Sequence, residues 1–319
     1  MLTTVALVLS AASLCKFFSK HAAGSGLPEF KSLIAGEMSN NEMDKLVSKR
    51  ILGAKILGLV MGIGSSLSIG SEGPLVHTAA CIAYLLMKFI PEFGEIFDSS
   101  SLTKQIFAAS AAVGVASAFN APVGGLLFSV EVTSSFYLIS NYWRSFIAAT
   151  AGSIACNLFL VAQDTKGVRA DPLTVLKILE VPLPYLKWEL MIFMIIGVVF
   201  GYAAHYYLQC HQKVHVFMRP YNKDYPLVAA TIAACITAIT VYVIGAYTDT
   251  SVGVIALVSD SLTTGKYIEM QAHHTGVKKA GGLIVHGIFR VLLTLMGTNI
   301  AVPAGIFMVQ LLLLLLSLP

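Results

Sequence analysis

The chain has 319 residues, of which 56% are hydrophobic and 12% are charged, and its net charge is +4. Soluble globular domains carry about a quarter charged residues, so most of this chain must lie in lipid or in protein packed inside lipid. The charge is small, and no dense run of Lys and Arg with interleaved aromatic residues is present, which excludes a nucleic-acid partner. We therefore expect an all-α integral membrane protein.

The apolar stretches of the chain are short, and several of them follow a proline. They run at about 1–18, 51–69, 75–90, 106–119, 123–139, 145–162, 188–210, 226–247, 282–297 and 304–318. Only a few reach the about 20 residues that a straight membrane-spanning helix needs. Segments that begin after Pro28, Pro74, Pro122 and Pro303 predict broken helices that meet near the middle of the membrane, not a simple up-and-down bundle.

Two groups of basic residues indicate an orientation. The first group is Lys45, Lys49, Arg50 and Lys55, and the second is Lys213, Arg219 and Lys223. Each group is interpreted as part of a connection between spans, which the positive-inside tendency places on the cytoplasmic side. The stretch 163–187 is then expected outside the membrane or at its interface.

The first break is the run Gly-Ser-Gly-Leu-Pro-Glu at 24–29. Unwound backbone at bilayer depth is tolerated only where it is buried in protein or lines a watery cavity. The helix start that follows presents N–H groups and a positive dipole end, which suits an anion. The Ser25 hydroxyl, between Gly24 and Gly26, is a candidate donor to a dehydrated anion. An isolated Gly-Ser-Gly is also typical of a capping or turn serine.

The second break is the run Gly-Ser-Glu-Gly-Pro at 70–74, in which Gly70 and Gly73 bracket a single glutamate, Glu72. A charged side chain at membrane depth costs about 2.5–3.5 kcal/mol on insertion scales and is usually functional. Ionised, Glu72 would compete with an anion for the same N–H groups and so act as a gate. The alternative is a carboxylate that only stabilises its own helix start.

Two further breaks follow. The run Phe-Asn-Ala-Pro-Val-Gly-Gly at 119–125 leads to Glu131 and Val132, and the run Pro-Ala-Gly-Ile-Phe occupies 303–307. After Gly305, the N–H groups of Ile306 and Phe307 are candidate donors to the same anion, with the Phe307 ring narrowing the pore. By itself this second run is an ordinary apolar turn.

Cysteines and histidines give no sign of a metal site. The five cysteines (Cys15, Cys81, Cys156, Cys210 and Cys235) form no Cys-x-x-Cys pair and are expected to be buried packing residues. His211 and His215 share a helical face and are expected to be interfacial and solvated, since no acidic or cysteine partner has a suitable spacing. The sequence contains no nucleotide-binding or hydrolase motif. We expect no enzyme activity, no metal and no cofactor, with chloride only as the permeant ion.

Taken in order, these runs resemble the CLC family of chloride channels and chloride/proton exchangers. The matching segments are 24–29, 70–74, 121–132 and 303–307, with Asn-Tyr-Trp-Arg at 141–144 following the third, and the similarity covers about residues 10–308. It implies an antiparallel repeat of tilted, broken helices, here lacking the first and last helices. The expected organisation is an incomplete pore domain over 1–308 and a divergent apolar tail over 309–319, without CBS domains.

The resemblance also assigns roles by position. It implies that Ser25 supplies the hydroxyl of the central anion site, that Ile306 and Phe307 supply backbone N–H donors, and that Glu72 is the gate. The glycines of the same breaks (Gly24, Gly26, Gly70, Gly73 and Gly305) would form the backbone of the filter.

One position distinguishes the channels of the family from its exchangers. Exchangers of the family carry a proton-accepting glutamate directly after the residue that matches Glu131, whereas this chain has Val132, which cannot relay a proton. Two other departures are Ser71, where the family usually has Lys or Arg, and Val309, where it has proline.

The resemblance therefore implies a gated chloride channel subunit that passes chloride down its gradient through a pore in each subunit of a dimer. The alternatives are a chloride/proton exchanger, or a truncated, non-conducting subunit that modulates full-length partners. The expected partners are chloride, membrane lipid, and either a second copy or a full-length subunit. The expected location is multi-pass in the membrane, at the plasma membrane.

Overall fold

The computed structural model describes residues 2–35, 40–65, 67–90, 99–133, 139–163, 189–248 and 289–305. Almost all of the expected outer stretch 163–187 lies outside these residues. So do the predicted donors Ile306 and Phe307 and the tail 309–319.

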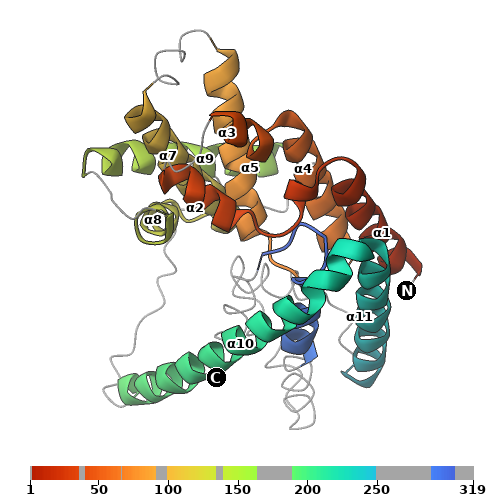
Figure 1. The fold of residues 1–319 in the computed structure, drawn as a ribbon. Coiled ribbons are helices and arrows are strands. Elements are labelled where there is room, and N and C mark those ends of the chain that lie inside the picture. The colour runs from red at the N-terminus through yellow and green to blue at the C-terminus, as the bar shows by residue number, and fades with distance from the viewer. Residues whose placement is uncertain are drawn as a thin grey trace. The chain divides into compact units, whose positions relative to one another are not determined.

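Within the described residues the helices make up most of the regular structure (Figure 1), and one isolated β-bridge joins Gly70 and Gly305. The long helices are α1 (Leu2–Phe17), α4 (Lys49–Gly64), α5 (Glu72–Phe89), α7 (Ser100–Phe119), α9 (Ile139–Gln163), α10 (Glu189–Asp224) and α11 (Pro226–Thr248). The short helices are η1 (Lys20–Ala22), α2 (Leu27–Ala35), α3 (Asn40–Leu46), α8 (Pro122–Phe128) and η3 (Ser129–Thr133). Residues 289–297 are also helical.

Three of the predicted breaks are helix starts. Pro28, Pro74 and Pro122 all lie in the first turn of α2, α5 and α8. Proline suits this place because its ring fixes a helical φ and because an N–H there would have no partner within the helix. Before α8, Asn120 ends α7 in the left-handed conformation, with a φ of 53°.

The predicted end of the span 188–210 is wrong, because α10 continues to Asp224. The run of apolar residues ends near residue 210, whereas the helical backbone continues through polar and charged residues that are mostly exposed. For the same reason the basic residues of the second group lie within α10 and not in a connection. In the first group, Lys49, Arg50 and Lys55 belong to α4.

The chain divides into two compact units. Unit 1 comprises Met1–Phe17, Leu57–Gly70 and Lys187–Pro319, and unit 2 comprises Phe18–Ile56 and Ser71–Leu186.

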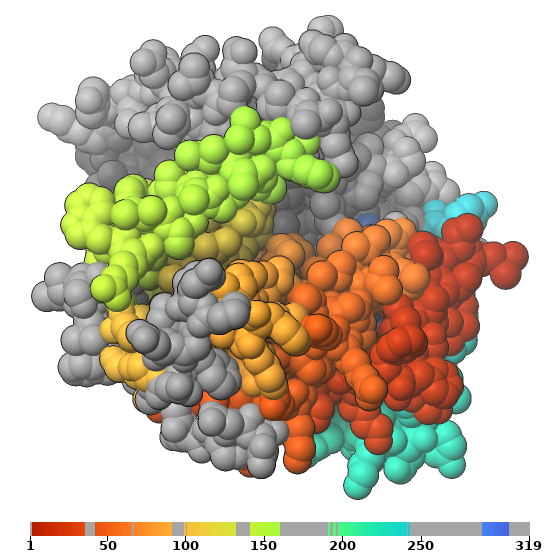
Figure 2. All heavy atoms as spheres, turned by 90° about the horizontal axis from the view of Figure 1, so that it is seen from above, coloured from red at the N-terminus to blue at the C-terminus, as the bar shows by residue number. Residues whose placement is uncertain are grey.

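In unit 2, α7 packs against α2, α5, α8 and α9. The rings of Phe30 in α2 and Phe107 in α7 meet edge to face, with 6.4 Å between their centroids. The Ser129 hydroxyl donates a 2.6 Å hydrogen bond to the carbonyl of Ala108, which holds η3 on α7. Part of α9 lies at the surface (Figure 2), and its Trp143 and Ile147 side chains are exposed. Such side chains are costly in water and fit a helix that faces lipid.

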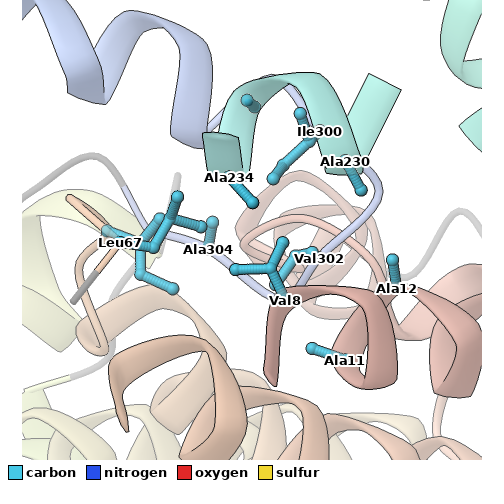
Figure 3. Close-up of a cluster of buried hydrophobic side chains, with 11 residues drawn as sticks. Val8, Ala11, Ala12, Leu67, Ala230, Ala234, Ile300, Val302 and Ala304 are labelled. Atoms are coloured by element: carbon cyan, nitrogen blue, oxygen red, sulfur yellow. The ribbon is translucent and has the colours of Figure 1, made fainter. Parts of the chain in front are cut away.

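In unit 1, α1 packs against α11 around a core of small and aliphatic side chains (Figure 3). Val8 and Ala11 of α1 lie with Ala230 and Ala234 of α11, and Val302 completes the cluster from the other end of the chain. The alanines let the two helices approach closely, as small residues do between membrane helices.

One described segment, Ser101–Phe119, is long and apolar enough to cross a membrane by length and composition. Three shorter apolar helices occur among the described residues: Leu2–Phe17, Pro122–Glu131 and Pro226–Thr240. Short apolar helices of this kind are what the interrupted sequence pattern predicts.

Candidate functional site

The candidate site in unit 2 begins with a tight turn before α2. Gly24 and Gly26 have φ values of +74° and +75°, in the left-handed region that costs a residue with a side chain about 1–2 kcal/mol. Between them, Ser25 turns its Oγ toward the helix and accepts a 3.3 Å hydrogen bond from the N–H of Leu27. The turn-serine interpretation of Ser25 is therefore correct, and its hydroxyl hydrogen remains a donor to some other group.

The turn packs directly against the start of α5. A Cβ built on Gly73 would lie 2.8 Å from the Cβ of Ser25, so no other residue fits at Gly73 without movement. Glu72 precedes it as the first residue of α5 and is buried, with only 4% of its surface exposed. The Ser71 hydroxyl donates a 3.3 Å hydrogen bond to Oε1 of Glu72. The structure thus brings the first two predicted breaks together.

Two helix N-termini converge at this contact. In α2 the first bond of the helical ladder runs from the N–H of Phe30 to the carbonyl of Gly26, and in α5 it runs from Leu75 to Ser71. The N–H groups before these bonds have no partner in the ladder, and helix starts carry a partial positive charge. The contact of Ser25 with Gly73 therefore combines two positive dipole ends, and each helix start carries a carboxylate in its first turn, Glu29 in α2 and Glu72 in α5.

A buried cation lies under the same turn. Lys55 of α4 is 0% exposed, and a Cβ built on Gly26 would lie 2.6 Å from its Nζ. Nζ is 2.7 Å from Nδ1 of His77, which is also fully buried, on the second turn of α5. The interpretation of Lys55 as a cytoplasmic flanking charge is therefore wrong.

The partners of His77 define its protonation. Its Nε2 lies 3.0 Å from the carbonyl of Leu46, which can only accept, so Nε2 carries the hydrogen. Nδ1 then presents its lone pair to Lys55, and the charge belongs to the ammonium because an ammonium holds its proton far more tightly than an imidazolium does. The result is a neutral imidazole beside a charged lysine.

Sequence reasoning missed this pair, although a signal was present. Lys55 stands alone within the apolar stretch 51–69, and His77 stands within 75–90. Ionisable residues inside such stretches are functional candidates by default. The proximity of Lys55 to Lys49 and Arg50 in the sequence concealed the difference between a buried charge and exposed ones.

A second contact between predicted segments lies in unit 1. Gly70 and Gly305 exchange two backbone hydrogen bonds, of 2.9 and 2.8 Å, in an antiparallel bridge. Nearby, Oγ of Ser68 is 2.8 Å from Oγ1 of Thr294 and donates to the carbonyl of Arg290. Each of these two glycines donates its N–H to the carbonyl of the other, and the bridge fixes the position of both backbone segments.

The structure leaves other site predictions where they stood. Val132 lies in η3, and its side chain is not among those described. Glu131, which precedes it, is exposed. Ile306 and Phe307 lie outside the described residues, so their role as N–H donors stays a prediction.

The solvated interpretation of the α10 histidines is right for His215, which is exposed, and incomplete for His211, which is half-buried, because both also make hydrogen bonds. His211 is 3.1 Å from Oγ1 of Thr298, and His215 is 2.9 Å from Oδ1 of Asn299, so both fix α10 to the segment before Gly305. Among the described residues no three His, Cys, Asp or Glu side chains are grouped for a metal ion.

The cysteine prediction is right only in part. Cys15 and Cys81 are buried, whereas Cys210 and Cys235 are exposed on α10 and α11. A cysteine in an apolar stretch of a membrane helix has a lipid side as well as a protein side, which the sequence pattern did not distinguish.

Among the described residues, one ion pair joins α3 to the end of α5. Asp44 accepts a 2.5 Å bond from Lys88 and a 2.6 Å bond from the Tyr84 hydroxyl. These two hydrogen bonds, that of Lys88 first, hold the pKa of Asp44 below its ordinary value. The pair is half exposed and is distinct from the Ser25–Glu72 contact.

Comparison with known proteins gives consistent similarities. A family model described as voltage gated chloride channel matches residues 6–313. Chloride channel protein 2 of Drosophila melanogaster is 37% identical over 216 residues, which cover 67% of this chain and 18% of that protein. Chloride channel protein 2 of Homo sapiens is 34% identical over 216 residues, 67% of this chain and 23% of that protein. The chain spans about a fifth of the length of these relatives.

Two solved structures share the fold. The crystal structure of a eukaryotic CLC transporter matches with a TM-score of 0.68 at 26% identity, over 96% of this chain and 48% of that one. A CLC-type fluoride/proton antiporter matches with a TM-score of 0.54 at 15% identity, over 95% of this chain and 76% of that one. At that identity the second likeness concerns the fold alone.

Proposed function

The chain belongs to the voltage-gated chloride channel family of membrane transport proteins, which are not enzymes, and from that premise we propose that it is a gated chloride channel subunit. Chloride would pass down its gradient through a pore within each subunit of a dimer at the plasma membrane. The observation that carries this proposal is the contact of Ser25 with Gly73, where the starts of α2 and α5 converge beside buried Glu72.

The chemistry of this contact suits a small dehydrated anion. The Ser25 hydroxyl and the N–H groups of the two helix starts replace water around the anion without a direct ion pair that would trap it. The N–H groups of Ile306 and Phe307 are proposed as further donors, by resemblance. Glu72 would hold the same position when the anion is absent, and would leave it when protonated or displaced.

Channel activity is proposed over exchange because Val132 cannot accept a proton. Coupled exchange is the second candidate, favoured by the likeness to the crystal structure of a eukaryotic CLC transporter. The two differ in one measurable property. In proteoliposomes with a fixed chloride gradient, a pH gradient leaves the reversal potential of a channel unchanged and shifts that of an exchanger.

The test of the gate replaces Glu72 by Gln in the full chain, reconstituted in liposomes. The expected result is a chloride efflux that no longer falls at the pH and voltage at which the wild type closes. Glu131→Gln is the matched control, because it removes an exposed carboxylate and is expected to leave gating unchanged. Unchanged gating in the Glu72 variant would refute the role of Glu72. No efflux from the wild-type chain would instead favour the non-conducting partner role.

A further inference from the structure

The buried pair of Lys55 and His77 lies against the turn that carries Ser25, and the roles proposed above leave it unused. Its position is fixed from three sides. His77 is hydrogen-bonded to the carbonyl of Leu46 and to Lys55. Both side chains pack against Gly26, since a Cβ built on Gly26 would lie 2.1 Å from Nδ1 of His77 and 2.6 Å from Nζ of Lys55.

This arrangement places a full positive charge close to the proposed anion site. Nζ of Lys55 lies 2.6 Å from the Cβ position on Gly26, which is one bond of about 1.5 Å from the Cα of Gly26. Consecutive Cα atoms are about 3.8 Å apart, so the ammonium lies within about 8 Å of the Cα of Ser25. At that distance it does not need to touch the anion. A buried charge acts across several ångströms because little water is present to screen it.

We infer that His77 is a positioning residue for anion binding, and that it acts by holding the charged ammonium of Lys55 against the Gly24–Gly26 turn. The inference rests on the proposed function, because it concerns the same site. The neutral imidazole accepts a hydrogen bond from Lys55 without cancelling its charge, which a carboxylate at the same place would do. Lys55 supplies the field and His77 fixes where that field originates.

Without His77, the buried ammonium of Lys55 would lose the acceptor that lies against the turn. Burial of an ammonium with one acceptor fewer favours the neutral amine or a shift of the side chain toward its other interactions. Either change removes positive potential from the turn. Loss of His77 should therefore weaken anion binding. His77 has this effect through Lys55, because its own hydrogen-bond partners are Leu46 and Lys55 and not the anion.

The test measures chloride binding to the purified full chain by isothermal titration calorimetry, with chloride replaced by gluconate in the starting buffer. Lys55→Met is expected to raise the chloride dissociation constant about 10- to 30-fold, the effect of one charge about 8 Å from an anion held at Ser25, at an effective dielectric constant near 20. His77→Leu is expected to raise the dissociation constant at least about 5-fold. His77→Gln retains an acceptor for Lys55 and is expected to stay within about twofold of the wild type.

A double-mutant cycle separates positioning from general damage. In the Lys55→Met background, His77→Leu is expected to have almost no further effect on chloride binding, because its only route to the anion is gone. Val76→Ala is the matched control, since Val76 is 0% exposed in the same turn of α5. It should lower thermal stability without changing the dissociation constant.

Each outcome has a distinct meaning. A dissociation constant unchanged by His77→Leu, or additive effects of His77→Leu and Lys55→Met, would overturn the inference and leave the proposed function intact. Absence of chloride binding by the wild type would refute the proposed function, and the inference with it. If His77→Leu does not purify as a folded protein, His77→Asn replaces it, because its shorter amide falls short of Lys55.

Discussion

The two glycines that flank Ser25 give a direct test of the packing of the candidate site. Gly24 and Gly26 have nearly the same φ, +74° and +75°, but their surroundings differ. A Cβ on Gly24 would have no heavy atom within 4 Å, whereas a Cβ on Gly26 would lie 2.1 Å from Nδ1 of His77 and 2.6 Å from its Cγ. Alanine at Gly24 is therefore the control for alanine at Gly26.

The free-energy cost of holding alanine in the left-handed backbone conformation is the same for both variants. A left-handed conformation costs an alanine about 1–2 kcal/mol, and the loss of glycine freedom in the unfolded chain returns about 0.4–1 kcal/mol. At Gly26 the methyl group must also displace the imidazole of His77. That adds about 1–3 kcal/mol for overpacking and threatens a buried hydrogen bond to a charged group, worth about 1.5–3 kcal/mol. Because a shifted imidazole keeps part of that bond, the expected difference between Gly26→Ala and Gly24→Ala is about 2–4 kcal/mol, below the full sum of the two terms.

The assay is the apparent midpoint of thermal unfolding in detergent, followed by size-exclusion chromatography with fluorescence detection. At about 2–4 °C per kcal/mol for a chain of this size, Gly26→Ala should melt about 5–15 °C below Gly24→Ala. Midpoints within about 2 °C of each other would mean that the turn does not pack on His77. The proposed position of Lys55 would then lose its support as well.

Three further changes can be measured in the same assay. Asn120→Ala should destabilise by about 1–2 kcal/mol more than Asn120→Gly, because both lose the hydrogen bonds from α9 but only alanine resists the left-handed φ; equal midpoints would contradict this. Gly125→Ala should destabilise by about 1–3 kcal/mol, because its Cβ would lie 2.4 Å from a backbone carbonyl of α7, and Gly124→Ala, with no atom nearer than 3.5 Å, should not. Asp44→Asn should lower the midpoint equally at pH 7 and pH 5, because the pKa of Asp44 is lowered by Lys88 and its pairing is complete above the ordinary value of 3.8. The difference should decline as the pH falls below 3.8 and vanish once the pH is below the lowered pKa of Asp44 in the folded state, and a difference that persists there would exclude the ion pair as its cause.

The helix starts of the site could be predicted from the sequence, because their causes are local. A proline that lacks an N–H fits the first turn of α2, α5 and α8, and flanking glycines permit the turns before them. The buried position of Glu72 also followed from its apolar surroundings, which require a charged residue to be packed in protein.

The contacts that complete the site could not be predicted in this way. The bond between Lys55 and His77 joins α4 to α5, and the bridge between Gly70 and Gly305 joins distant parts of the chain. Hydrophobic periodicity reports which face of a helix is buried but not which residue of another helix it meets. The length of α10 was missed for a related reason, since loss of apolar character was taken as the end of the helix.

The Gly70–Gly305 bridge has a consequence for biosynthesis. Its two strands of backbone can pair only after the ribosome has produced residue 305, when α1 and α4 have long since emerged. Unit 2 needs nothing beyond Leu186 and can fold earlier. The nascent chain therefore carries Gly70 without this partner while residues 71–304 are made, and a product that ends before Gly305 lacks the two hydrogen bonds of the bridge.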